Sequence, residues 1–331
     1  MIGFCLAAGA GSRLAPLTRV TPKPLLAPAG RPLLDLAVEA LLAAGAARVV
    51  VNAHHGAERL AAHLAGRPAV QVVREPVLLG TAGGLANAAR LGLLGGGGDP
   101  VLVTCADHVV DPADLSALAA ALARTDASMI TGLTSATGGS FGLRLEDSPA
   151  DDGCRVVPDP DGPWDSAGAY ALRAGVLEGL EPVPSTLASA LLRPLLDRGA
   201  LAGLPFRGPV ADAGTLHRLL TVSAGLLTGS WPYDLPPGVL VTPTRCGRPQ
   251  RPVLVADGAT HHPAATIAGP VVLDGGSRVE AGAVVTRAIL GPGAVVGAGA
   301  RVVGSVLGPG VSLAPGMAAV AALLPGPPAL G

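Results

Sequence analysis

Hydrophobic positions in the first 230 residues form short β-branched runs that alternate with longer stretches rich in Ala and Leu. Such short runs, bounded by Gly, Pro or polar residues, predict strands, and the Ala/Leu stretches predict helices. The predicted strands are residues 2–7, 47–53, 69–75 and 100–107, and the predicted helices are residues 31–45, 56–66, 80–94 and 111–124. This alternation indicates βαβ units and an α/β domain with a mainly parallel sheet. Because ligands bind beyond the carboxyl ends of parallel strands, the loops after Leu6, Ala53, Glu75 and Asp107 are expected to face one site.

The pattern changes to a period of six after a Pro-rich segment at residues 231–252. The aliphatic positions of this period are Val255, Ile267, Leu273, Val279, Leu290, Val296, Leu307 and Leu313, and the small or β-branched positions four residues later are Ala259, Val271, Ser277, Ala283, Ala294, Ala300 and Val311. His261 takes one aliphatic position, and the connecting segments 285–289 and 302–306 are five residues long instead of six. The period resembles the hexapeptide repeat of a left-handed parallel β-helix, in which aliphatic residues fill the interior.

These patterns predict an α/β domain at residues 1–230, a Pro-rich linker at 231–252, a left-handed β-helix at 253–318 and a disordered tail at 319–331. The flat, aliphatic-rich faces and the end coil of a β-helix need covering. We therefore expect the chain to form a homo-oligomer through this domain.

Composition and charge narrow the function classes. The chain has 331 residues, a net charge of −1 and only 2% aromatic residues, and it shows no basic cluster, so nucleic-acid binding is not expected. Its four cysteines are far apart and show no metal-ligand spacing, which predicts reduced, buried thiols in a cytoplasmic protein. No basic leader and no uninterrupted apolar run of membrane-spanning length is present, so no membrane association is expected.

The stretch LAAGAGSRLAPLTRVTPKPLL, residues 6–26, directly follows the first predicted strand and contains Lys23, the only lysine of the chain. It resembles the motif G-x-G-[ST]-R-L-x-P-L-T-x-x-x-P-K-P-L of the sugar-1-phosphate nucleotidylyltransferases, or NDP-sugar pyrophosphorylases. A dinucleotide-binding loop would need a third glycine where Leu14 stands, directly after Arg13. The resemblance covers most of the chain, because a Rossmann-like nucleotidyltransferase domain followed by a left-handed β-helix is common in that family. It is nearest to members like the mannose-1-phosphate guanylyltransferases.

The resemblance implies that this loop holds a nucleoside triphosphate. Glycines at positions 9 and 11 let backbone N–H groups approach phosphates without a Cβ in the way. Arg13 offers a forked donor to the β- and γ-phosphates, and Lys23 places a compact charge at the reacting phosphate. The implied catalytic residues are Arg13, Lys23 and Asp107, and the implied nucleotide-binding residues are Leu6, Ala8, Gly9, Gly11, Ser12, Glu75, Gly80 and Thr81. The alternative is a surface loop with two ordinary cations.

Two aspartates occupy places where the family keeps carboxylates for Mg²⁺. Asp107 ends the strand in VLVTCADHVV, and Asp212 lies in VADAGTLHRLL, where the tryptophan of the family motif W-x-D-x-G-T is missing. Two hard carboxylates suit a magnesium ion that bridges phosphate oxygens. The alternatives are a simple strand end for Asp107 and a helix cap for Asp212.

The segment REPVLLGTAGGLANA resembles the family's base-reading segment. Gly80 would lie against the base, and the Glu75 carboxylate could accept hydrogen bonds from the N1–H and exocyclic amine of guanine, which favours GTP. A solvated strand end is the alternative for Glu75. His54 and His55, which follow Asn52, are interpreted as part of a solvated loop because no third metal ligand is in view.

The sugar-binding segments match the family only in part. Gly142 and Gly168 stand at the family's sugar-contacting positions, with Phe141 in place of a tyrosine and Tyr170 retained. The family's Glu-Lys-Pro is replaced by CRVVPDPDGPW, where Asp159 or Asp161 could bind hydroxyls. Residues that could replace the phosphate-binding lysine are Arg155 and Arg207.

The resemblance implies that the chain condenses an NTP, with GTP favoured, with mannose 1-phosphate or a related sugar or cyclitol phosphate. Mg²⁺ would assist in-line attack on the α-phosphorus, and pyrophosphate would leave. Two alternatives stay open. A non-catalytic nucleotide-sensing subunit would bind the nucleotide without releasing pyrophosphate, and a β-helix acyltransferase, suggested by His261 and His262, would consume acyl-CoA.

Overall fold

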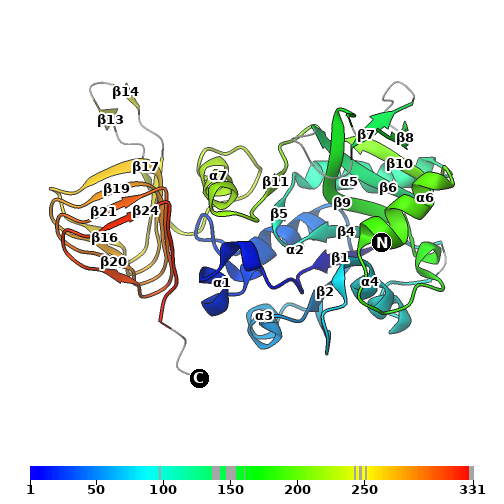
Figure 1. The fold of residues 1–331 in the computed structure, drawn as a ribbon, viewed down its shortest axis with the longest axis horizontal. Helices are drawn as coiled ribbons and strands as arrows, with labels where there is room; N and C mark the ends of the chain where they lie inside the picture. Colours follow the sequence, from blue (N-terminus) through cyan, green and yellow to red (C-terminus); the bar gives the residue numbers. More distant parts are fainter. Residues whose placement is uncertain are drawn as a thin grey trace. The chain divides into compact units, whose positions relative to one another are not determined.

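The computed structural model describes residues 1–96, 98–135, 142–146, 154–159, 161–241, 244–245, 248–249 and 252–327. It divides the chain into two compact units, the first formed by Met1–Gly9 and Leu34–Val210 and the second by Ala10–Leu33 and Ala211–Gly331 (Figure 1). This grouping differs from the predicted boundary at residue 230. Segment 10–33 belongs with the C-terminal strands because its apolar residues pack there. Leu17 lies close to Gly308, and Gly30 lies close to Pro236.

The first unit is built on a nine-stranded sheet in the order β3-β2-β1-β4-β9-β6-β10-β8-β7. Its strands are β1 (Ile2–Leu6), β2 (Val49–Ala53), β3 (Val70–Arg74), β4 (Pro100–Cys105), β6 (Met129–Ser135), β7 (Leu143–Leu145), β8 (Cys154–Pro158), β9 (Trp164–Arg173) and β10 (Leu201–Pro205). Strands β1 to β4 pair in parallel, as the alternating pattern predicts. Strand β9 runs antiparallel between β4 and β6, so the sheet is mixed. The predicted α/β class is confirmed.

Helices connect the strands of the first unit. They are α2 (Leu33–Ala43), α3 (Ala57–Leu64), α4 (Gly80–Arg90), α5 (Pro112–Arg124) and α6 (Arg193–Asp197), with the short helical segments η3 (Ala174–Leu177) and η4 (Ala188–Leu192) and the short strand β5 (His108–Val109). Helix α5 starts sharply because the Asp111 side chain accepts a hydrogen bond from the Ala113 N–H and Pro112 occupies the first turn. The core between sheet and helices is built mainly from Leu, Val and Ala, with few aromatic residues such as Phe4 and Tyr170.

The second unit contains the motif-bearing segment and the C-terminal strands. The segment forms η1 (Ser12–Leu14), α1 (Leu17–Val20) and η2 (Lys23–Leu25), and β11 (Ala211–Asp212) and α7 (Leu216–Leu227) follow later in the chain. The C-terminal strands are β12 (Gly238–Val241), β13 (Thr244–Arg245), β14 (Arg248–Pro249), β15 (Val253–Ala256), β16 (Thr260–His261), β17 (Thr266–Leu273), β18 (Arg278–Val279), β19 (Val284–Leu290), β20 (Val295–Val296), β21 (Arg301–Val303), β22 (Val306–Leu307), β23 (Ser312–Leu313), β24 (Ala318–Val320) and β25 (Leu323–Leu324).

Parallel pairing in the C-terminal strands repeats along the chain. Val253 pairs with Val271, 18 residues on, and Arg301 pairs with Ala318, 17 residues on. Three six-residue repeats give the longer spacing, and one five-residue connection gives the shorter, so the pairing is consistent with the predicted β-helix (Figure 1). Its handedness stays a prediction. The predicted aliphatic positions line the interior, with Leu273, Val279, Leu290, Val296 and Leu307 all buried.

Two details differ from the repeat-based prediction. Strand β24 extends past residue 318, and strand β25 lies wholly beyond it. The paired structure therefore continues past the predicted end of the repeats at residue 318. Val306 and Leu307 pair in parallel with Leu323 and Leu324, which explains this extension. His261 is exposed on β16, which is an edge strand and, among the described strands, pairs only with β18, where Val279 is its register partner.

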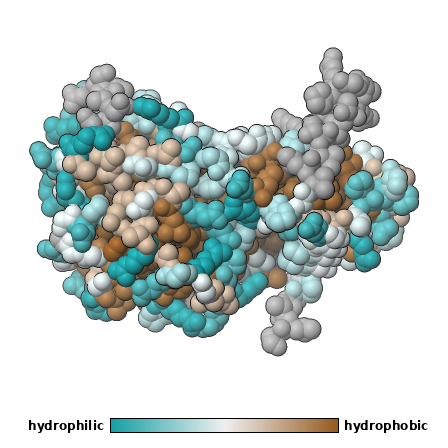
Figure 2. All heavy atoms as spheres, turned by 180° about the vertical axis from the view of Figure 1, so that it is seen from behind, coloured by the Kyte–Doolittle hydropathy of each residue, from teal (hydrophilic) through white to brown (hydrophobic). Residues whose placement is uncertain are grey.

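Hydrophilic and hydrophobic residues are interspersed over the visible face of the molecule (Figure 2). The exposed large hydrophobic side chains of the described part are Val77, Leu78, Leu91, Val183, Met317 and Val320. Among the helices described, none combines the length and apolar character needed to span a membrane.

Candidate functional site

The loop after β1 is fixed by a buried polar network in the first unit. Leu6 and Ala8 are buried, whereas Gly9 is exposed at the point where the chain enters the second unit. The Asn52 side chain, which is only 1% exposed, accepts a hydrogen bond from the Ala7 N–H at 2.8 Å. This contact sets the direction in which the chain leaves the strand.

Gly11 is required by its backbone conformation and by its neighbours. Its φ of 64° lies in the left-handed region, and a Cβ there would stand 2.8 Å from Lys23 Cβ and 3.0 Å from Thr18 Cγ2. The Thr18 hydroxyl donates to the Gly11 carbonyl oxygen at 3.1 Å. Gly9 has no such constraint, because a Cβ would meet nothing within 4 Å. Gly11 therefore allows the Lys23 stem to pack against the loop.

Lys23 is a buried cation directed at a carboxylate. It opens η2 and is 7% exposed, and its Nζ lies 3.8 Å from Asp212 Oδ1. A charged ammonium in so dry a position requires a partner of opposite charge. The structure therefore brings together two residues that the sequence places almost 190 positions apart.

Asp212 presents one oxygen that accepts no hydrogen bond. Oδ2 accepts from Arg218 Nη1 at 2.6 Å, but Oδ1 is buried and has no hydrogen-bond partner among the described residues. The residue does not cap α7, because the Thr215 side chain accepts from the Arg218 N–H in that role. The helix-cap alternative for Asp212 is therefore wrong.

Arg13 joins this cluster beside Gly214. A Cβ on Gly214 would stand 2.6 Å from Asp212 Oδ1 and 2.7 Å from Arg13 Nη2, so glycine is needed for the guanidinium and the carboxylate to approach each other. The Arg13 side chain, like that of Ser12, is exposed. Three cations, Lys23, Arg13 and Arg218, thus surround one aspartate, an arrangement that attracts phosphate oxygens.

Hard oxygen donors fit a magnesium ion, and Asp212 supplies one with its Oδ1, which accepts no hydrogen bond from a described residue. Asp107 of the first unit offers a carboxylate in the turn after β4, where its side chain is 24% exposed. Each residue has the donor chemistry expected of a magnesium ligand.

Asp107 lies in a cluster that the sequence did not predict. The Nδ1 atom of His108 lies 2.9 Å from Asp107 Oδ1, and one ligand atom from each of Cys105, Asp107 and His108 lies within 4.8 Å of the others. Cys105 is half-buried rather than fully buried. The spacing of the cysteines alone did not reveal this cluster, because Cys105 ends a strand and the next turn brings the other two side chains to it. The spacing C-x-D-H was the available signal.

The His108 ring is held against the backbone of β9. Gly168 has a φ of 70°, and a Cβ there would stand 2.7 Å from both Cδ2 and Nε2 of His108. Burial lowers the pKa of His108, but the hydrogen bonds to Asp107 and Cys105 and their negative charge outweigh this effect and raise it well above its usual value. Gly168, a predicted sugar-binding residue, thus packs against the histidine that follows Asp107.

Glu75 does not present its carboxylate to solvent. It is 4% exposed, Oε1 accepts from Asn52 Nδ2 at 2.7 Å, and Oε2 accepts from the Leu79 N–H at 3.1 Å. Both oxygens are therefore engaged within the first unit, and the solvated-end alternative is wrong. The observation that favoured guanine loses its support, because this carboxylate positions Asn52 and the loop before α4.

Gly80 and Thr81 begin α4 and contact a distant segment. Gly80 has a φ of 72°, and a Cβ would stand 2.4 Å from the carbonyl oxygen of Ser185. The Thr81 hydroxyl accepts from the Leu187 N–H at 2.7 Å. These contacts give both residues a packing role in addition to any contact with a base. His54 is also engaged, because its Nδ1 lies 2.9 Å from the Glu75 carbonyl oxygen.

Two predicted sugar-binding residues lie next to each other. The Asp159 N–H donates to the Gly142 carbonyl oxygen at 3.0 Å, and the Asp159 carboxylate accepts from Arg144 Nε at 3.3 Å. Tyr170 is buried, accepts a hydrogen bond from the Ser166 hydroxyl at 3.1 Å, and has a pKa raised by burial. Phe141 lies outside the described residues.

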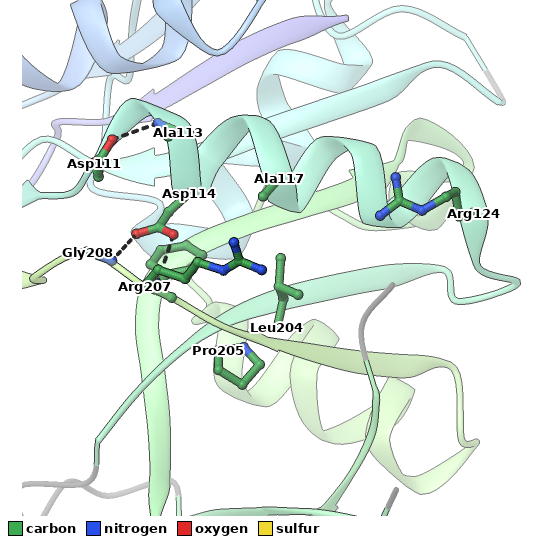
Figure 3. Close-up of a pocket in the computed structure, with 10 residues that line it drawn as sticks. Asp111, Ala113, Asp114, Ala117, Arg124, Leu204, Pro205, Arg207 and Gly208 are labelled. Atoms are coloured by element: carbon green, nitrogen blue, oxygen red, sulfur yellow. Dashed lines mark hydrogen bonds between the residues drawn. The ribbon is translucent and has the colours of Figure 1, made fainter. Parts of the chain in front are cut away.

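A separate pocket of about 600 Å³ lies between α5 and the segment after β10 (Figure 3). The Asp114 carboxylate accepts hydrogen bonds from the N–H groups of Arg207 and Gly208 at 3.0 and 2.9 Å, which anchors that segment. Arg207 lines this pocket, whereas Arg155 is exposed and lies 3.3 Å from Glu146. Residues lining the pocket are Asp111, Ala113, Asp114, Ala117, Arg124, Leu204, Pro205, Phe206, Arg207 and Gly208.

Comparison with known proteins relates this chain to the nucleotidyl transferases. Residues 2–143 match the family model described as nucleotidyl transferase. The chain is 31% identical to an N-acetylmuramate alpha-1-phosphate uridylyltransferase from Neisseria meningitidis serogroup B, over 70% of this chain and the full length of that relative. It is 39% identical to the corresponding enzyme of Caulobacter vibrioides over 33% of this chain, which spans 46% of that relative.

Other similarities are more partial. A mannose-1-phosphate guanylyltransferase catalytic subunit beta from Drosophila melanogaster is 37% identical over 32% of this chain and 30% of its own length. Among solved structures, a Bacillus anthracis protein described as a glucose-1-phosphate thymidylyltransferase, crystallised with sucrose, superposes with a TM-score of 0.56. It shares 20% sequence identity and covers 68% of this chain and 94% of its own, which supports the fold.

Proposed function

Because the chain belongs to the nucleotidyl transferase family, we propose that it condenses an NTP with a sugar 1-phosphate, forming an NDP-sugar and releasing pyrophosphate. The observation that supports this most directly is the buried Lys23 ammonium 3.8 Å from Asp212, with the Arg13 guanidinium also beside Gly214. This cluster can bind phosphates and keeps one carboxylate oxygen for a cation.

The reaction needs charge neutralisation and alignment rather than a protein nucleophile. A phosphate oxygen of the sugar 1-phosphate attacks the α-phosphorus in line, a new P–O bond forms, and the bond to the β-phosphate oxygen breaks. Lys23 is proposed to neutralise charge at the transferred phosphate. Arg13, exposed on a loop, is proposed to hold the β- and γ-phosphates that leave.

Magnesium is the cofactor that the donor chemistry favours. We propose Asp107 and Asp212 as its protein ligands, since both offer hard carboxylate oxygens and Asp212 Oδ1 is not used by any described donor. When bound, the ion would offset negative charge on the phosphates and withdraw electrons from the reacting phosphorus.

The identities of the nucleotide and of the sugar are more specific proposals. GTP with mannose 1-phosphate, or a related sugar or cyclitol phosphate, follows from the motif resemblance, but Glu75 no longer argues for guanine. The relative matched over its full length is a uridylyltransferase for N-acetylmuramate 1-phosphate, and this favours UTP with a sugar of that class. We propose UTP first and GTP second. Assembly into a homo-oligomer through the C-terminal strands stays part of the proposal.

A pyrophosphate-release assay tests the proposed function. The full chain with Mg²⁺ is offered ATP, CTP, GTP, UTP and dTTP, each combined with the 1-phosphates of mannose, glucose, heptose and N-acetylmuramate. Release that depends on both substrates is expected for at least one pair. Calorimetric binding of a nucleotide or NDP-sugar with no release for any pair would contradict the proposal and favour a sensing subunit.

A further inference from the structure

The side chains after β4 combine hard and soft metal ligands. Asp107 offers a carboxylate, His108 an imidazole nitrogen and Cys105 a thiol, and one ligand atom from each lies within 4.8 Å of the other two. None of the three is fully buried, with exposed side-chain fractions of 24% for Asp107 and 21% for His108. A hydrated ion can therefore reach them.

The distances are close to what a tetrahedral site requires. Zinc binds sulfur at about 2.3 Å and nitrogen or oxygen at about 2.0–2.2 Å, which places neighbouring ligand atoms roughly 3.5 Å apart. His108 Nδ1 and Asp107 Oδ1 are already 2.9 Å apart. Side-chain rotations that bring the three atoms to these distances from one point would complete the set, because the atoms already lie within 4.8 Å of one another.

The surrounding backbone holds the cluster in place. The N–H of Ala106 donates to the Leu6 carbonyl oxygen at 3.0 Å, and Cys105 pairs in register with Leu6 of β1. The His108 ring is fixed by its contact with Gly168, whose left-handed φ of 70° and missing Cβ allow the ring to lie there. The histidine and cysteine positions are therefore preorganised rather than left to a mobile loop.

We propose that Cys105, Asp107 and His108 form a binding site for a thiophilic divalent cation such as Zn²⁺ or Co²⁺, with a fourth position open to water or a substrate oxygen. Thiolate and imidazole select such ions, whereas Mg²⁺ prefers oxygen ligands alone. Binding displaces the thiol proton and any imidazole proton to solvent. Because Zn²⁺ would occupy Asp107, it would also inhibit the proposed reaction, and this effect on turnover rests on the proposed function. The binding of the metal ion itself does not.

Cobalt spectroscopy on the full chain tests this site without any nucleotide. The chelator-treated protein is titrated with Co²⁺, and we expect one ion per chain, with a thiolate-to-cobalt charge-transfer band in the near ultraviolet and strong visible bands. Zn²⁺ should abolish these bands, whereas a large excess of Mg²⁺ should not. The two tests are independent. Co²⁺ binding could be observed even if no pyrophosphate were released, and pyrophosphate could be released even if no Co²⁺ were bound.

Variants assign the ligands. Cys105→Ser should remove the charge-transfer band, and His108→Gln should weaken Co²⁺ binding by more than about 10-fold, because loss of even an outer-shell partner costs about 10–100-fold. Cys5→Ala is the matched control, because Cys5 is buried on the neighbouring strand, and it should keep the band. Circular dichroism checks that each variant folds. A wild-type chain without the band, a band that persists in Cys105→Ser, or unchanged affinity in His108→Gln would overturn the proposal.

Discussion

Lys23 Nζ lies 3.8 Å from Asp212 Oδ1, and that oxygen accepts no hydrogen bond from any described residue. The pair joins the single lysine of the chain to the carboxylate expected at a metal. A buried cation beside a half-buried carboxylate with one oxygen available for a ligand is typical of a site that binds a charged substrate together with a counter-ion.

Replacing Asp212 by asparagine tests the carboxylate. Asp212→Asn keeps the shape but removes the charge that offsets Lys23 and Arg218 and the hard donor that Mg²⁺ prefers. Turnover should fall by about 100-fold or more, and the Mg²⁺ concentration for half-maximal rate should rise. Pyrophosphate release measured across a Mg²⁺ titration checks this. Asp257→Asn, at an exposed position, is the control. An unaltered Mg²⁺ dependence would remove Asp212 from the metal site.

Replacing Gly11 by alanine tests the packing behind Lys23. Gly11 and Gly293 both have positive φ, at 64° and 66°, but only at Gly11 would the new Cβ meet Lys23 at 2.8 Å. Each alanine should cost about 1–2 kcal/mol for its backbone conformation. Gly11→Ala should cost about 1–3 kcal/mol more through overpacking and should also reduce turnover. Urea unfolding of both variants checks this, and equal losses of stability would contradict it.

Replacing Glu75 by glutamine separates its two interpretations. If Glu75 holds Asn52 and the Leu79 N–H, Glu75→Gln leaves one buried donor without an acceptor and lowers the free energy of unfolding by about 1–3 kcal/mol. The ratio of kcat/KM values for UTP and GTP should not change. Glu178→Gln, an exposed substitution, is the control. A changed nucleotide ratio with unchanged stability would restore the base-reading role.

Thiol modification tests how the two cysteines on neighbouring strands differ. Burial, with the nearby Cys105 and Asp107, raises the pKa of the Cys5 thiol, so little thiolate forms at neutral pH. Cys105 is half-buried. In the native chain an alkylating reagent should label Cys105 and spare Cys5, and Zn²⁺ should slow the labelling of Cys105. Peptide mass spectrometry checks this. Labelling of Cys5 first, or no protection by Zn²⁺, would contradict it.

Periodicity was sufficient to predict the α/β core and the parallel pairing of the C-terminal strands, because the alternation of strands and helices and the six-residue repeat are local signals. The antiparallel position of β9 between β4 and β6 depends on pairing between strands far apart in the sequence, which no local pattern predicts. The packing of segment 10–33 with the C-terminal part of the chain was also not predictable from local patterns, because it depends on contacts between residues far apart in the sequence, such as Gly30 with Pro236.

Motif resemblance led to Lys23, Arg13 and Asp212, and the structure brings these three together in the second unit. It could not show the direction of the Glu75 carboxylate, because Asn52, 23 residues earlier, determines it. It also did not identify Cys105 and His108 as possible metal ligands. A cysteine three residues before a histidine is a weak signal until a turn folds the two onto the same aspartate.

The rate of pyrophosphate release by Lys23→Ala tests the central claim most directly. The best NTP and sugar 1-phosphate pair from the substrate panel is used, with Arg19→Ala as the control, since Arg19 is exposed in the same segment. Turnover in Lys23→Ala should fall by about 100-fold or more, with the fold preserved by circular dichroism, whereas Arg19→Ala should stay near wild type. A rate for folded Lys23→Ala within about 3-fold of wild type, far above that expectation, would contradict the account.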